Sequence, residues 1–291
     1  MHIEPEVVRR SVKAALEEDI GPGDITSMSL IPDEVNGRGY MVVKGEGVVA
    51  GLIVAVEAFH LVDPRISFVP KVADGQRASP GTIIADVAGP AARILSAERT
   101  ALNFVQRLSG IATLTAQAVE LVNSGARGQR VPRILDTRKT TPGLRLLEKY
   151  AVRCGGGSNH RLGLYDAVLI KDNHVRVVGG AAQAVSRARA AVGPFVKIEV
   201  EVTTLDEVQA VMAADRDGWP DVVLLDNMSP AQMSEAVGII GRRAKVEASG
   251  GVTLANLREV AATGVDYISM GALTHSAKAL DISLEIDIDP A

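Results

Sequence analysis

Cations and imidazoles gather between Leu135 and His174, in a chain whose net charge is −4. Arg138 and Lys139 follow one short apolar run, and Lys171 follows another. A charge at the end of a buried strand needs a partner or a ligand, so these positions indicate a pocket rather than a solvated surface. Cationic side chains in such a pocket are suited to bind a small polyanion through charge-assisted hydrogen bonds.

A glycine-rich stretch lies between these two groups of cations. Gly155–Gly157 lead into Ser158–Arg161, which contains an imidazole, His160, and a further cation. One interpretation of the glycines is a plain flexible connector. The residues that follow them favour a loop that brings His160 and Arg161 to the same pocket.

Three other cations in this region, Arg145, Lys149 and Arg153, recur at helical spacing. That spacing is typical of a solvated helix face, which is the favoured interpretation. Cys154 is the single cysteine, so an internal disulfide is excluded. Its place beside the glycines allows a nucleophile, but a small buried filler is the preferred interpretation.

Acidic residues end two further apolar runs, Glu201 in FVKIEVEV and Asp226 in LLDN. A period of two puts Lys197, Glu199 and Glu201 on one strand face, and the aliphatic face should pack on helices. Glu199 can form a structural ion pair with Lys197, and this interpretation stays open beside one without that pair. Glu201 and Asp226 can either hold a hydrated Mg²⁺ or bind ribose hydroxyls, and the sequence leaves both roles open.

Two glycine turns follow the last apolar runs. Glycine lets backbone N–H groups approach an anion, and a following helix adds the positive end of its dipole. Paired turns after the last strands of a βα barrel are suited to bind phosphate. His275 comes shortly afterwards and is interpreted as a helix cap in preference to a phosphate contact. The residues of the two turns are Ser249, Gly250, Gly251, Met270, Gly271 and Ala272.

From Arg133 onward, short apolar runs alternate with helical stretches. Repeated βα units predict a parallel sheet that closes or nearly closes into a barrel, with the active site at the carboxyl ends of its strands. An open doubly wound sheet is the alternative, but no GxGxxG follows the first run. The expected strands are Ile134–Arg138, Ala167–Lys171, Val196–Val202, Val222–Asp226, Val246–Ser249 and Tyr267–Met270, and the expected helices include Ala181–Ala191, Leu205–Ala214 and Pro230–Arg242.

The first part of the chain mixes helices with short strands. The prediction is therefore an α/β protein, with a smaller N-terminal α+β domain before an incomplete barrel of about six or seven strands. We place the domains at residues 1–110 and 111–275, with the tail 276–291 packing on the first domain. The elements expected in the first part are a helix over Pro5–Asp19, a hairpin over Arg38–Val49, a helix over Leu52–Leu61, short strands over Ser67–Gly89, and a long helix over Ser96–Asn123 with Ser96 as its N-cap and a bend or junction at Gly110.

Composition excludes several classes of protein. Apolar residues make up 47% and aromatic residues 3% of the 291 residues, a profile typical of α/β proteins. The negative net charge disfavours a nucleic-acid binder. No apolar run reaches membrane length, and the N-terminus lacks the apolar core of a signal peptide. We expect a cytoplasmic protein with no nucleic-acid or membrane partner.

Several segments resemble the quinolinate phosphoribosyltransferase family, and together they span nearly the whole chain. They are ERTALNF-Q-LSGIAT, DTRKT-PGLR, KYAV-CGGG-NHR-GL-D, LIKDNH, EVEV and LLDN. The resemblance implies an enzyme of the pentosyltransferase class in de novo NAD biosynthesis. Such enzymes transfer phosphoribosyl from phosphoribosyl pyrophosphate to quinolinate and release pyrophosphate and carbon dioxide, giving nicotinate mononucleotide, with Mg²⁺ as cofactor.

The resemblance also implies roles for residues of this chain. Arg99 would reach the active site of a neighbouring subunit, which implies a homodimer with shared sites or a hexamer built from such dimers. Glu201 and Asp226 would be the metal ligands, with Mg²⁺ held mainly through the donor's pyrophosphate and water. The implied catalytic residues are Lys139, Lys171, Glu201 and Asp226. The implied substrate-binding residues are these four with Arg99, Thr137, Arg138, His160, Arg161 and the two glycine turns.

Three other functions remain as alternatives. A phosphoribosyltransferase for nicotinate or a related acceptor would bind one carboxylate in place of two, so this many cations would be excessive. A Schiff-base aldolase would use Lys171 as its nucleophile. A non-catalytic phosphosugar-binding protein would need the glycine turns but not Arg99, Arg138 and Arg161.

Overall fold

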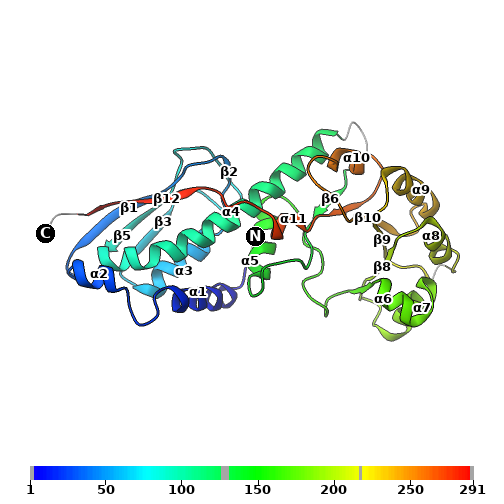
Figure 1. Ribbon diagram of the computed structural model, residues 1–291, viewed down its shortest axis with the longest axis horizontal. Coiled ribbons are helices and arrows are strands. Elements are labelled where there is room, and N and C mark those ends of the chain that lie inside the picture. The colour runs from blue at the N-terminus through cyan, green and yellow to red at the C-terminus, as the bar shows by residue number, and fades with distance from the viewer. Residues whose placement is uncertain (1–2, 126–130, 216–217, 289–291) are drawn as a thin grey trace. The chain divides into compact units, whose positions relative to one another are not determined.

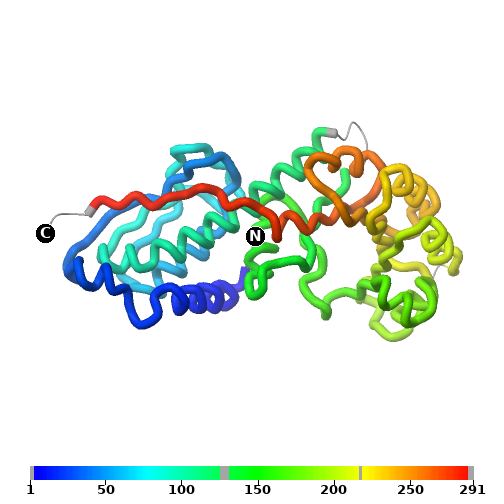
Figure 2. The backbone as a smooth tube through the Cα atoms, in the orientation of Figure 1, coloured from blue at the N-terminus to red at the C-terminus, as the bar shows by residue number. Residues whose placement is uncertain are grey.

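The computed structural model describes residues 3–125, 131–215 and 218–288 (Figures 1 and 2). The described residues fall into two compact units. Unit 1 comprises Met1–Ala116, Thr140–Gly156 and Leu273–Ala291, and unit 2 comprises Gln117–Lys139 and Gly157–Ala272. Each unit is therefore assembled from segments that lie far apart in the sequence.

An antiparallel sheet organises unit 1. Among the described residues it has four strands, in the order β12-β1-β5-β3. Their bounds are β1 Asn36–Val43, β3 Ser67–Pro70, β5 Ile83–Pro90 and β12 Ile282–Ile288. The last strand, β12, comes from the end of the chain and pairs with β1 from Gly37↔Ile288 to Val43↔Ile282. Residues 289–291 of the expected tail lie outside the described residues.

The hairpin expected over Arg38–Val49 is wrong. Both edges of β1 are already occupied, by β5 and by β12. The next strand, β2 (Gly47–Val48), pairs with β4 (Arg77–Ala78) instead. A turn-like KGEG between two apolar runs predicts a hairpin only when no distant strand competes for the same edge.

Helices complete unit 1, and the longest of them is α4 (Ala91–Gly125), whose residues from Gln117 onward belong to unit 2. It begins earlier than expected, so Ser96 lies inside the helix, where its hydroxyl donates to Asp24 Oδ2 at 2.9 Å. The helix also continues through Gly110. A Cβ at that position would collide with the backbone carbonyl of Lys278, so this glycine permits a close approach of two backbones. The other helices of this part are α1 Pro5–Asp19, α2 Ile25–Leu30, α3 Leu52–Val62, α5 Arg145–Cys154 and α11 Ala272–His275.

Helix α5 is not the solvated helix that its cations predicted. Lys149 is 1% exposed and Glu148 is fully buried. Arg107 of α4 forms an ion pair with Glu148, with 2.6 Å between Nη2 and Oε1. The same Nη2 donates to the carbonyl oxygen of Thr274 at 2.7 Å and to Thr141 Oγ1 at 3.0 Å. Helical spacing cannot reveal this burial, because α4 comes from another part of the sequence.

A parallel sheet organises unit 2. In the described part of the chain it has six strands, in the order β6-β11-β10-β9-β8-β7, which confirms the expected incomplete barrel. The strands are β6 Arg133–Leu135, β7 Val168–Ile170, β8 Ile198–Val202, β9 Val222–Asp226, β10 Lys245–Ser249 and β11 Tyr267–Ser269. The helices between them are α6 Asp172–Val178, α7 Ala181–Ala191, α8 Leu205–Met212, α9 Pro230–Ile240 and α10 Leu257–Ala261, and Figure 1 shows α7, α8 and α9 on the outer side of the sheet.

The barrel is open between its first two strands. No pairing joins β6 to β7 among the residues that the structure describes. The segment that follows the glycines runs along the outer edge of β6 instead. Ser158 donates its N–H to Ile134 O at 2.8 Å, and its carbonyl accepts from Asp136 N at 3.2 Å. The glycine-rich loop therefore supplies backbone partners that a closed barrel would take from a neighbouring strand.

The described helices include none that is long and apolar enough to cross a membrane.

Candidate active site

A cavity of about 550 Å³ opens at the carboxyl ends of the parallel strands, and all the residues that line it belong to unit 2. Strand ends meet there because every pairing in this sheet is parallel. The predicted residues that line it are Thr137, Arg138, Lys139, His160, Arg161, Lys171, Glu201, Asp226, Ser249, Gly250 and Gly251. Ser269, which begins the second expected glycine turn, also lines it. The other lining residues are not among the predicted site residues, and they are Leu169, Leu224, Asn227 and Glu247.

Four of the predicted substrate-binding residues do not line this cavity. Arg99 is an exposed residue of α4 in unit 1. Met270 is 2% exposed, and its N–H donates to Leu135 O at 3.0 Å. Gly271 and Ala272 follow it, while Ser269 of the same turn does line the cavity.

The cationic side of the cavity carries Arg138 and Arg161. Arg161 Nη1 donates to Ala167 O at 3.2 Å, and its buried Nε has no hydrogen-bond partner among the described residues. Burial, and next the charge of Arg138, lower the pKa of Arg161. A buried N–H donor beside a second guanidinium is costly unless an anion binds both, so this arrangement favours an anionic ligand.

The acidic side of the cavity carries Glu201 and Asp226. Glu201 is the last residue but one of β8, and Asp226 is the last residue of the neighbouring strand β9. Glu201 Oε2 lies 3.0 Å from Lys171 Nζ, so the acidic and cationic sides meet at this pair. Asp226 Oδ2 accepts from Asn227 Nδ2 at 2.7 Å. Asn227 has a left-handed backbone, with φ of 55°, which turns the chain away from the strand end.

The glycine turn after β10 has a left-handed backbone at Gly250 and Gly251, with φ of 85° and 62°. A Cβ on Gly250 would collide with the side chain of Asn227, whereas a Cβ on Gly251 would meet only Asn227 Oδ1, at 4.0 Å. Position 250 therefore requires glycine, because a side chain there would collide with Asn227 within the turn. No atom of the described residues covers Gly251 closely, so a ligand in the cavity can approach its backbone.

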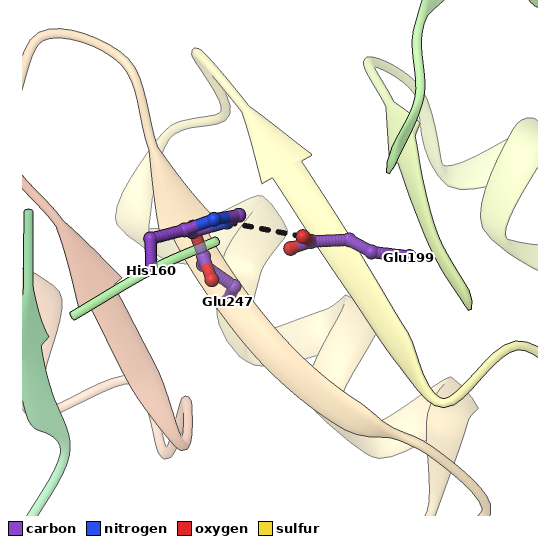
Figure 3. Close-up of side chains that lie close together, drawn as sticks. All are labelled: His160, Glu199 and Glu247. Atoms are coloured by element: carbon purple, nitrogen blue, oxygen red, sulfur yellow. Dashed lines mark ion pairs between the residues drawn. The ribbon is translucent and has the colours of Figure 1, made fainter. Parts of the chain in front are cut away.

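A histidine and two acids form a cluster, in which His160 and Glu247 line the cavity and Glu199 does not (Figure 3). His160 Nε2 lies 3.0 Å from Glu199 Oε2 and 3.6 Å from Glu247 Oε1. Glu199 is 7% exposed and Glu247 is 2% exposed. Glu199 does not pair with Lys197, whose Nζ lies 2.7 Å from Asp221 Oδ1. The alternation that turned Glu199 inward also predicts an inward Glu247, two residues before Ser249, and could have identified it.

Glu247 has an unusual protonation equilibrium. Burial, and next the negative charge of Glu199, raise the pKa of Glu247 to about 8. Two carboxylates that share a buried site cannot both ionise without large cost, so one proton remains between them at neutral pH.

This cluster does not fit a metal ion. The backbone N–H of Arg161 donates to His160 Nδ1 at 2.7 Å, so that nitrogen carries no proton. The neutral ring must then carry its proton on Nε2, the atom that faces both carboxylates. A protonated Nε2 has no lone pair for a metal.

Two further residues singled out in the sequence belong to unit 1 and are not among the residues that line the cavity. Cys154 is buried, and burial raises the pKa of its thiol to about 12, which favours the packing role over a nucleophile. His275 ends α11, and its Nδ1 lies 2.6 Å from Ser276 Oγ.

Two family models together match most of the chain. The N-terminal domain of quinolinate phosphoribosyl transferase matches residues 24–109, and the C-terminal domain matches residues 111–285. The chain belongs to the quinolinate phosphoribosyl transferase family. The resemblance found in the sequence motifs is thereby confirmed.

Individual relatives agree with the family models. A probable carboxylating nicotinate-nucleotide pyrophosphorylase from Bacillus subtilis is 45% identical over 271 residues, covering 93% of this chain and 90% of that protein. The crystal structure of NadC from Streptococcus pyogenes is similar with a TM-score of 0.92 and 37% identity, covering all of both chains. The nicotinate-nucleotide pyrophosphorylase of Francisella tularensis has a TM-score of 0.89 and 39% identity, with 98% of each chain covered.

Proposed function

We propose that this member of the family transfers the phosphoribosyl group of phosphoribosyl pyrophosphate to quinolinate. The acceptor then loses carbon dioxide, and the products are nicotinate mononucleotide and pyrophosphate, a step of NAD biosynthesis. The family membership and the names of the relatives support this activity. The observation that carries it to this chain is the paired Arg138 and Arg161 in the cavity.

The acceptor is assigned to the two arginines. Quinolinate carries two adjacent carboxylates, and a guanidinium binds a carboxylate through two parallel hydrogen bonds. The buried Nε of Arg161 has no hydrogen-bond partner among the described residues and can donate to a carboxylate of the acceptor. Nicotinate has one carboxylate and would occupy one guanidinium fork in place of two, so it is the less favoured acceptor.

The donor is assigned to the opposite side of the cavity. Gly251 and Ser249 offer backbone and hydroxyl donors to the 5-phosphate. Glu201 and Asp226 face the ribose, where they stabilise the positive charge that develops as pyrophosphate departs. Lys139 and Lys171 balance the charge of the leaving pyrophosphate.

Mg²⁺ fits the acidic side of the cavity. Glu201 and Asp226 are oxygen ligands at neighbouring strand ends, the ligand type that Mg²⁺ prefers, and one or two carboxylates suffice when phosphates and water complete the shell. When bound, Mg²⁺ supplies neutralisation of the pyrophosphate charge. The two carboxylates would hold the ion, and Lys171 next to Glu201 would keep the local charge balanced.

Decarboxylation follows from the substrate's own chemistry once the arginines hold it. Alkylation makes the ring nitrogen cationic, and the electron pair of the breaking C2–carboxylate bond is stabilised beside that cation. Carbon dioxide leaves, and C2 takes up a proton. In this scheme Arg138 and Arg161 orient the ring, and no side chain forms a covalent bond with it.

The assembly is proposed to be a cytoplasmic homodimer with shared active sites, or a hexamer of such dimers. Arg99 is exposed on α4, and the motif ERTALNF-Q-LSGIAT that contains it supports a role towards a partner subunit.

An assay of the products tests the proposed reaction. We expect purified protein with quinolinate, phosphoribosyl pyrophosphate and Mg²⁺ to release pyrophosphate and carbon dioxide in equal amounts. Nicotinate in place of quinolinate should give little pyrophosphate, and a chelator should abolish the reaction. Pyrophosphate release that is faster with nicotinate than with quinolinate would overturn the assignment of the acceptor.

A further inference from the structure

The loop that carries Arg161 is held by buried acids. Asp136 is fully buried; its Oδ1 accepts the backbone N–H of His160 at 2.9 Å, and its Oδ2 accepts from Asn159 Nδ2 at 2.5 Å. These bonds place the backbone of the loop along the open edge of β6. The ring of His160 then points between the carboxylates of Glu199 and Glu247, as Figure 3 shows.

Both ring nitrogens of His160 have directed partners. Nδ1 accepts the backbone N–H of Arg161 at 2.7 Å, and Nε2 faces Glu199 Oε2 at 3.0 Å. An N–H donor on one side and a carboxylate on the other are compatible with only one neutral tautomer, the one protonated at Nε2. The opposite tautomer would set two N–H groups against each other at Arg161 and a lone pair against Glu199.

This chain of bonds leads from the buried acids to the substrate side of the cavity. Glu199 fixes the ring, the ring accepts from the backbone of Arg161, and Arg161 then reaches Ala167 O with Nη1 at 3.2 Å. Glu247 Oε1 lies 3.6 Å from the same Nε2, too far for a hydrogen bond, and adds a second negative group on that side of the ring. The orientation of the guanidinium is thereby tied to a residue that does not line the cavity.

We propose that Glu199, supported by Glu247, is a positioning residue that acts through His160 to hold Arg161 in the orientation that binds the acceptor. His160 then contributes placement, because both of its ring nitrogens are engaged. This inference rests on the proposed function for the identity of the acceptor.

Substitution of Glu199 tests the inference by kinetics. Glu199→Ala removes the acceptor for Nε2–H, and we expect the KM for quinolinate to rise about tenfold or more, since a buried hydrogen bond to a charged group is lost. The KM for phosphoribosyl pyrophosphate should change much less. Glu199→Gln keeps an oxygen acceptor in the same place and should restore the KM for quinolinate to near the wild-type value. A glutamine variant as impaired as the alanine variant would overturn the proposal.

Glu207→Ala provides a matched control in the same βα unit. Glu207 Oε2 accepts from Thr203 N at 2.7 Å and helps to cap α8, and it does not line the cavity. Its loss should lower the unfolding midpoint of the protein while the KM for quinolinate stays unchanged. An equal rise of this KM in Glu207→Ala would reduce the effect at Glu199 to general destabilisation and overturn the proposal.

Nitrogen NMR of ¹⁵N-histidine-labelled protein reads the ring directly, with a His160→Asn variant to assign the signal. We expect His160 to show a protonated Nε2 and an unprotonated Nδ1 in the wild type, and a mixture of tautomers in Glu199→Ala. A protonated Nδ1 in the wild type, or a Glu199→Ala variant with both its tautomer and its KM unchanged, would overturn the proposal. Wild-type protein that turned over no quinolinate would contradict the proposed function, and the spectrum would still decide the tautomer.

Discussion

At the scale of single residues, the cavity favours an anionic ligand because it contains cationic side chains whose burial is costly without a partner. Arg161 illustrates this, because its pKa is lowered and its Nε lacks a partner among the described residues. An anion that binds there recovers hydrogen bonds that the folded chain leaves unmade. The same cost makes these residues sensitive to substitution.

Arg138→Ala and Arg161→Ala should each weaken quinolinate binding selectively. Removing one partner of a desolvated charge pair costs about 2–5 kcal/mol, which is about 30-fold to several thousandfold in Kd. Binding of phosphoribosyl pyrophosphate should change much less, and calorimetry with each ligand measures both effects. Arg189→Ala is the control, because Arg189 pairs with Asp221 and does not line the cavity. Wild-type affinity for quinolinate in both variants would contradict the role of these arginines.

Glu247 should make the protein less stable as the pH rises. Its pKa is about 8 in the folded chain, through burial and the charge of Glu199, against an ordinary value of 4.5. Between these values the folded state binds more protons than the unfolded state, so the free energy of unfolding falls as pH increases through this window. Glu247→Gln cannot ionise and should show a flatter profile in urea unfolding from pH 4.5 to pH 8. Parallel profiles for the two proteins would contradict the raised pKa.

At the scale of elements, the turn after β10 contains two glycines with different roles: Gly250 is needed for packing, and Gly251 faces the ligand. Gly251→Ala should weaken binding of phosphoribosyl pyrophosphate, and its left-handed backbone should cost about 1 kcal/mol of stability. Gly250→Ala should be more destabilising because its Cβ collides with Asn227. Calorimetry and thermal unfolding measure the two effects.

Gly264→Ala controls for backbone strain, since Gly264 has φ of 90° and does not line the cavity. It should lose stability without losing affinity for the donor. Unchanged donor affinity in Gly251→Ala would remove this turn from the phosphate site.

The contact between α4 and α5 includes an ion pair whose acid is fully buried. Glu148→Ala should destabilise the protein by about 1.5–3 kcal/mol, because Arg107, whose side chain is 32% exposed, would lose its charged partner. Lys13→Ala is the contrasting case, since Lys13 and Glu17 form an exposed pair on α1, and it should change stability by less than about 1 kcal/mol. Denaturant unfolding compares them, and similar small effects would show that the Glu148 pair contributes little.

At the scale of the whole molecule, the proposed dimer predicts complementation between inactive variants. Arg99→Ala and Lys171→Ala should each be inactive alone. In a mixed dimer with shared sites, one site collects both lesions and the other collects neither. Random pairing makes half of the dimers mixed, so about a quarter of all sites should be intact after co-expression. Tagged mixed dimers without activity would mean that Arg99 acts in its own subunit.

The sequence by itself determined the strands of unit 2 and the polar residues at their ends. Alternation and the βα rhythm are local patterns, and parallel strands bring their carboxyl ends to one edge whatever their order in the sheet. That is why Lys171, Glu201, Asp226 and the turn at Ser249 could be assigned to one cavity in advance, and all of them line it.

Only the tertiary structure decided which distant residues meet. The partners of β1, the burial of Lys149, the close approach at Gly110 and the pairing of Glu199 with His160 all depend on segments far apart in the chain. Local periodicity says which face a side chain occupies but not what lies opposite. That choice follows from the order of strands and the competition for their edges, because each backbone edge and each buried charge takes the partner that the completed fold brings to it.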